Sequence, residues 1–144
     1  MHMDRIDTVV LLPLIDEPKE RWAYVKISPT QVRLLMGAVF QTRRPDLTLR
    51  VWLAATTHMD WNTGEIDADR KKLAEDAYTN SAEVSRAMSE LTKIGAIIKR
   101  RRGQKVTYFV NGSIAWHGSE GSRQAAAKSA SHPRLVTLNG EKVE

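Results

Sequence analysis

The sequence of 144 residues contains no cysteine. This absence excludes disulfide bonds, thiolate metal sites and cysteine nucleophiles. A membrane-spanning helix needs about 20 consecutive apolar residues, and Pro13 interrupts the longest apolar run, residues 9–15. The N-terminus also lacks the charged-then-apolar order of a secretory signal peptide. We therefore expect a cytoplasmic protein that makes no membrane contact.

Motifs for catalysis are also missing. There is no glycine-rich loop followed by Lys-Ser or Lys-Thr for nucleotide phosphates, and no strand-to-helix turn that would expose a nucleophilic serine. The four histidines are scattered and form no His-x-His pair: His2, His58, His117 and His132. Structural roles are expected for the three tyrosines, Tyr24, Tyr78 and Tyr108. The sequence therefore predicts no enzymatic activity, no metal site and no cofactor.

Charge is present, and it is concentrated in one region. The formal net charge of the chain is +5. Residues 70–105 hold ten lysines and arginines but only four acidic residues, so the rest of the chain is nearly balanced. A localised basic surface on a balanced protein indicates a polyanionic partner.

The N-terminal part shows the patterns of strands and helices. Residues 8–15 are rich in Val, Leu and Ile and are expected to be extended, with an acidic turn at 16–20. Residues 22–27 are again β-favouring, and Ser28 and Pro29 suit the start of a helix. That helix carries apolar residues at helical spacing and should end near Arg43: Val32, Leu35, Met36, Val39 and Phe40. Pro45 should begin a second helix, with an apolar stripe of Leu47, Val51, Trp52, Ala55 and Met59.

The region from 62 to 110 predicts a more specific arrangement. A turn at 62–64 precedes a very short strand at 65–66, and Asp69 should cap a helix that runs to about Tyr78. A second helix should follow from about Ala82 to Ile94, with Gly95 as its left-handed C-terminal residue. Residues 96–101 and 105–110 read as two strands around a basic turn at 102–104. Two helices and a basic hairpin in this order predict an α+β fold of the winged helix-turn-helix type, with a three-helix core.

In such a fold the second helix of the pair enters the DNA major groove. Its N-terminal half would then supply the base and phosphate contacts, with Arg86 best suited to guanine. The candidate helix residues are Asn80, Ser81, Glu83, Ser85, Arg86 and Ser89. The hairpin adds cations and an amide for the DNA backbone: Lys99, Arg100, Arg101, Arg102, Gln104 and Lys105. For Glu83, contact with cytosine and stabilisation of its own helix N-terminus both stay open.

Three segments in and around this region resemble one family of bacterial proteins. They are WAYVKI at 22–27, MDWNTGEI at 59–66 and YFVNGSIAWHG at 108–118. Across residues 22–118 the chain resembles small plasmid replication initiators of the firmicute type. The resemblance implies double-stranded DNA binding at a plasmid origin, in the nucleoid or plasmid fraction, together with other replication or partition proteins. A winged-helix transcriptional repressor that controls its own promoter, and a protein-interaction adaptor without DNA, remain the alternatives.

These patterns divide the chain into three parts. Residues 1–43 form an N-terminal β/helix extension, residues 44–118 the winged-helix domain, and residues 119–144 a flexible tail rich in Gly, Ser and Ala. The apolar face of the helix at 29–41 is the expected pairing surface of a homodimer, because many such modules bind pseudo-palindromic DNA as dimers.

Overall fold

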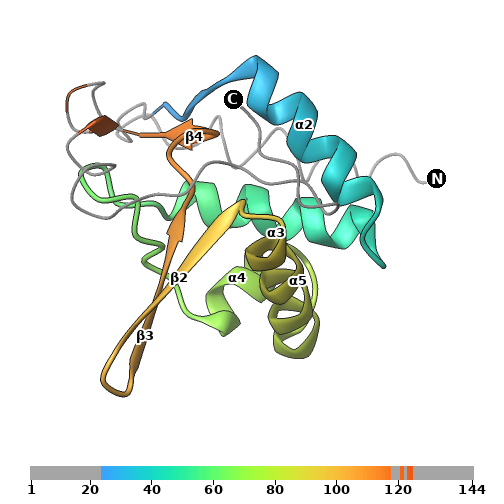
Figure 1. The fold of residues 1–144 in the computed structure, drawn as a ribbon. Coiled ribbons are helices and arrows are strands. Elements are labelled where there is room, and N and C mark those ends of the chain that lie inside the picture. The colour runs from blue at the N-terminus through green and yellow to red at the C-terminus, as the bar shows by residue number, and fades with distance from the viewer. Residues whose placement is uncertain (1–23, 118–120, 122, 125–144) are drawn as a thin grey trace, which may run out of the picture.

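The computed structural model describes residues 24–117, 121, 123 and 124. Along the chain it contains β1 (Lys26–Ile27), α2 (Pro29–Phe40), α3 (Pro45–Thr57), α4 (Arg70–Asp76), α5 (Ser81–Lys93), β2 (Ile97–Arg102), β3 (Lys105–Val110) and β4 (Ala115–Trp116) (Figure 1). The predicted α+β class is therefore confirmed, and the helices with the hairpin are compatible with a winged-helix-like arrangement. The strand and turn expected at 8–20, and most of the expected tail, lie outside the described residues.

Helices α2 and α3 begin where the sequence predicts. Ser28 caps α2, because its hydroxyl accepts a hydrogen bond from the backbone N–H of Gln31 at 3.3 Å. Pro45 is the first residue of α3, and every residue of the predicted apolar stripe is buried, although α3 ends at Thr57 and Met59 lies beyond it. Only part of the apolar face of α2 is buried: Leu35 and Val39 join the core, whereas Met36 and Phe40 stay 54% and 78% exposed.

Helices α4 and α5 are joined by a tight turn. Asp69 caps α4 through the N–H of Lys72, at 2.8 Å, and Asn80 caps α5 through the N–H of Glu83, at 2.9 Å. Helix α4 ends at Asp76, two residues before the predicted end at Tyr78. Both helices turn apolar residues toward the core, and seven of these residues are buried: Leu73, Ala74, Ala77, Val84, Ala87, Met88 and Leu91.

Strands β2 and β3 pair antiparallel, from Ile97 opposite Val110 to Arg102 opposite Lys105. The turn between them is therefore only Gly103 and Gln104, one residue shorter than predicted, and Gly103 adopts a positive φ of 59°. The expected short strand at 65–66 lies beside β3, where the N–H of Ile66 donates to the carbonyl of Tyr108 at 2.8 Å. The sequence did not predict the pairing of β1 with β4, which places Lys26 opposite Trp116.

A fully buried asparagine joins the end of α5 to the end of β3. The side chain of Asn111 donates to the carbonyl of Gly95 at 2.8 Å, and its backbone N–H donates to the carbonyl of Ala96 at 3.0 Å. Its side-chain oxygen accepts from the N–H of Ser113 at 2.9 Å and from the Ser113 hydroxyl at 2.8 Å. Gly95 has the predicted positive φ, at 85°. These bonds fix the direction in which the hairpin leaves α5.

No helix in the described part of the chain is long and apolar enough to cross a membrane.

We predict that Asn111→Ala lowers the free energy of unfolding by about 1–3 kcal/mol, because it leaves partly buried polar groups of Gly95 and Ser113 without their partner. Urea denaturation followed by circular dichroism measures this loss. Asn62→Ala, at an exposed turn position, is the matched control and should cost less than about 0.5 kcal/mol. An equal loss in the two variants would contradict the role assigned to the Asn111 junction.

Candidate nucleic-acid interface

Helix α5 presents a polar face made of serines and basic residues. Ser81, Ser85, Arg86 and Ser89 are all exposed, and the side chain of Arg86 is 67% exposed. Asn80 is also exposed, but its side-chain oxygen already accepts the capping bond from the N–H of Glu83. Of the predicted helix contacts, the serines and Arg86 are therefore the ones open to a ligand.

Glu83 lies between two arginines. One carboxylate oxygen is 3.3 Å from Nη1 of Arg44, and the other is 3.4 Å from Nη1 of Arg86. Its side chain is only 20% exposed, whereas that of Arg44 is 50% exposed. In the free protein Glu83 thus connects α5 to the residue before α3. A contact between two distant parts of the sequence leaves no local pattern, so the sequence did not indicate it.

The cations of the hairpin differ from Arg44 and Arg86 in their exposure and in their ion pairing. Lys99, Arg101, Arg102 and Lys105 are exposed, as is Gln104, while Arg100 is partly buried. No ion pair links these cations to an acidic side chain of the described residues. Arg102 and Lys105 stand directly opposite each other in the ladder, and like charges in that position destabilise a strand pair. A polyanion bound at the turn would relieve this repulsion.

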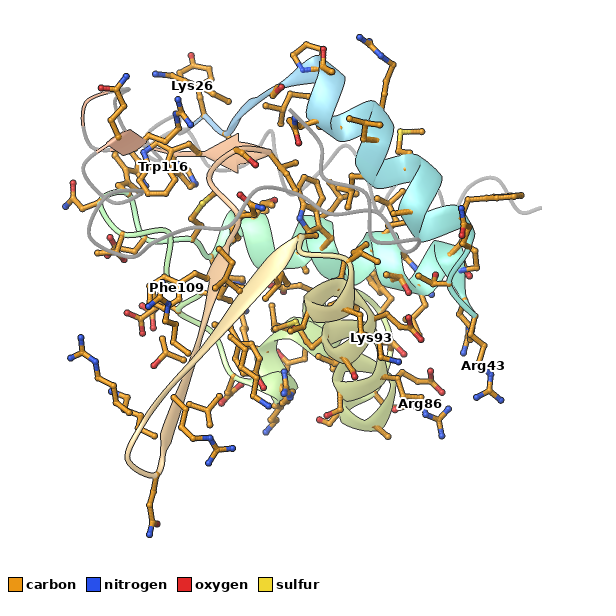
Figure 2. All side chains as sticks on the ribbon, viewed as in Figure 1. Lys26, Arg43, Arg86, Lys93, Phe109 and Trp116 are labelled. Atoms are coloured by element: carbon orange, nitrogen blue, oxygen red, sulfur yellow. The ribbon has the colours of Figure 1, made fainter. Side chains whose placement is uncertain are left out.

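The hairpin and the start of α5 extend toward the same side of the molecule. In Figure 1 the turn of the hairpin and the beginning of α5 both lie at the lower edge of the view, away from β1, β4 and α2. Figure 2 shows the Arg86 side chain leaving α5 near this edge. One extended ligand is therefore able to contact both elements.

The basic residues of α4 are mostly engaged within the protein. The guanidinium of Arg70 lies 5.0 Å from the centre of the Tyr108 ring and donates to the Tyr108 hydroxyl at 3.2 Å. Lys72 lies 3.7 Å from Asp76, which also pairs with His58 at 2.5 Å. Part of the positive charge of residues 70–105 is therefore engaged within the protein and is less available to a ligand.

Two further arginines stand beside α5. Arg43 and Arg44 are exposed and line a depression of about 300 Å³ whose opposite wall includes Glu83 and Arg86. The sequence pattern indicated only a helix end near this pair, and α2 in fact ends earlier, at Phe40. The available signal was two consecutive arginines directly before the proline that begins α3.

The shifted pKa values belong to residues outside this surface. Backbone N–H groups of Asn62 and Thr63 donate to the carboxylate of Asp60 and lower its pKa. Burial lowers the pKa of His117, whose ring stacks on Trp61 with centroids 5.2 Å apart. Within the described ranges, no three His, Asp or Glu side chains gather closely enough to hold a metal ion.

Comparison with known proteins finds no relative of this chain. The chain matches no family model, no curated protein and no solved structure.

Tyr78, in the turn between α4 and α5, has a strained backbone. Its φ is +58° and its side chain is 77% exposed. Arg50 holds the turn by donating to the carbonyl of Ala77 at 2.6 Å. Left-handed backbone costs a residue with a Cβ atom roughly 1–2 kcal/mol, a cost that glycine does not have.

We predict that Tyr78→Gly is more stable than Tyr78→Ala by about 1 kcal/mol, because both variants lose the exposed ring and only alanine keeps the Cβ atom. Thermal unfolding of the two variants measures the difference. If the alanine variant were equally stable, the turn would not be strained in solution.

Proposed function

We propose that the chain binds double-stranded DNA in a sequence-specific manner, with α5 in the major groove and the β2–β3 hairpin on the neighbouring backbone. The observation that carries this proposal is the set of hairpin cations without ion-pair partners among the described residues, on the same side as the exposed serines and Arg86 of α5. DNA phosphates would supply the negative charge that these cations do not find in the protein. Neutralising the phosphates would also release counterions from the DNA.

The order of elements supports a winged-helix domain. Helix α3, the bridge at 65–66, α4, α5 and the hairpin follow one another as in that fold, with α4 and α5 as the helix-turn-helix. In this fold the second helix of the pair reads base edges from its N-terminal half. Arg86, the sixth residue of α5, would then contact guanine through two donors, while Ser81 and Ser85 donate to phosphates.

For the biological role, we propose initiation of plasmid replication or its control. Support comes from the resemblance in residues 22–118, and in particular from the segment after the hairpin. Asn111, Ile114 and Trp116 of that segment are all buried, so it forms part of the core. Mapping the bound DNA tests this role: repeated direct sites beside AT-rich DNA support an origin. One inverted repeat over a promoter supports a repressor instead.

The proposal includes a homodimer that pairs through α2. Met36 and Phe40 are four residues apart on one face of this helix, and both are more than half exposed. Burying such side chains contributes about 1.5–3 kcal/mol each, and a second copy would supply the same apolar surface.

We predict that Arg86→Ala and the pair Arg101→Gln with Arg102→Gln weaken DNA binding in different ways. Loss of Arg86 should reduce the preference for a selected site over random DNA by about 1–3 kcal/mol, because a base contact is lost. The hairpin variant should weaken binding to both DNAs equally and flatten the salt dependence, because only phosphate contacts are lost. Fluorescence anisotropy on both duplexes at several salt concentrations measures both effects. An unchanged preference in Arg86→Ala would rule out α5 as the reading helix in this register.

We predict that Phe40→Ser shifts the chain toward monomer in analytical ultracentrifugation. Tyr78→Ala is the control, since Tyr78 is 77% exposed and Phe40 78% exposed. Only the Phe40 variant should change the association constant. A wild-type chain that sediments as a monomer at all concentrations would contradict pairing through α2.

A further inference from the structure

The corner between α2 and α3 carries two adjacent arginines beside the proposed reading helix. Arg43 and Arg44, together with Arg86, line the depression of about 300 Å³ against α5. Figure 2 shows Arg43 and Arg86 at the same edge of the molecule, both directed away from the helices. Three guanidinium groups on one small surface suit an oxygen-rich anion, because each of them presents several N–H donors.

This corner and the hairpin flank α5 on different sides. Strand β2 packs against α5 on one side, and the start of α3 lines the depression on the other. In Figure 1 α5 accordingly lies between the hairpin and the α2–α3 corner. An α-helix with its side chains is about 10–12 Å across, close to the width of the major groove at about 12 Å. A helix seated in the groove therefore fills it, and the elements on its two sides meet the two bordering phosphate backbones.

Glu83 controls the charge of this corner. It holds Nη1 of Arg44 and Nη1 of Arg86 with separate oxygens, at 3.3 and 3.4 Å. The remaining N–H donors of both guanidinium groups stay open to other acceptors. Glu83 and Glu90 also line the depression, so two carboxylates oppose its three arginines. The corner is thus preorganised for phosphate but only weakly positive.

We propose that Arg43 and Arg44 form a second phosphate-binding site, for the DNA strand opposite the one that the hairpin contacts, and that Glu83 limits its strength. This inference rests on the proposed DNA binding by α5. It assigns Glu83 a role other than base contact: it orients Arg44 and Arg86 and keeps the corner from binding bare backbone strongly. The protein then contacts the phosphate backbones on both sides of the major groove only when α5 lies in that groove.

The experiment measures the affinity of the full chain, as a function of salt, for a duplex that carries a selected site and for a random-sequence duplex. On the selected duplex, Arg44→Gln should reduce the magnitude of the slope of log K against log salt by about 0.9, the value for one lost phosphate contact. Arg33→Gln is the matched control, because Arg33 is exposed on α2 and does not line the depression. It should leave the slope unchanged. Circular dichroism melting verifies that each variant is folded.

The same measurement on Glu83→Gln tests the role assigned to this carboxylate. Removing this carboxylate should tighten binding to random DNA and steepen the salt slope, and its effect should shrink when Arg44 is already Gln. Equal slopes for the Arg44 and Arg33 variants, with wild type still binding DNA, would overturn the second site and leave the proposed function standing. A wild-type chain that binds no duplex at low salt would contradict the proposed function itself.

Discussion

The arrangement of the surface depends on the buried junction at Asn111. Its side chain and backbone bind the carbonyls of Gly95 and Ala96 at the end of α5, and its side-chain oxygen binds Ser113 beyond β3. The hairpin is therefore attached at both of its ends to one fixed point beside α5. Because Asn111 is fully buried and its bonds are internal to the protein, the relative direction of helix and hairpin is set before any ligand arrives, and binding need not order it.

The basic residues around this junction differ in their surroundings between the helices and the hairpin. On and beside the helices, arginines contact neighbouring side chains: Arg44 and Arg86 share the carboxylate of Glu83, while Arg70 lies against the ring of Tyr108. On the hairpin, the cations have no acidic partner among the described residues, and two of them face each other across the ladder. A fold that keeps repelling charges at its tip loses stability there. A polyanionic ligand provides the compensation, which is why the hairpin supports the proposed function more strongly than the total charge does.

Local features of the sequence predicted local features of the structure. Asp69 caps α4 and Gly95 follows α5 as predicted, because capping and left-handed backbone depend on the residue itself. The α+β class and the hairpin followed from periodicity in the same way. The β1–β4 pair and the Arg44–Glu83 ion pair were missed, because each joins residues far apart in the chain. Arg43 and Arg44 became part of the candidate surface only when folding placed them against α5.

The central claim is that α5 and the hairpin contact one duplex together. Titrating the isotope-labelled chain with a duplex and following backbone amide resonances by NMR tests it most directly. The account predicts that resonances of Ser81, Ser85 and Gly103 shift together and saturate at the same DNA concentration, while the Trp61 and His117 region stays unchanged. Saturation of helix and hairpin at different concentrations, or shifts centred on Trp61 and His117, would contradict it.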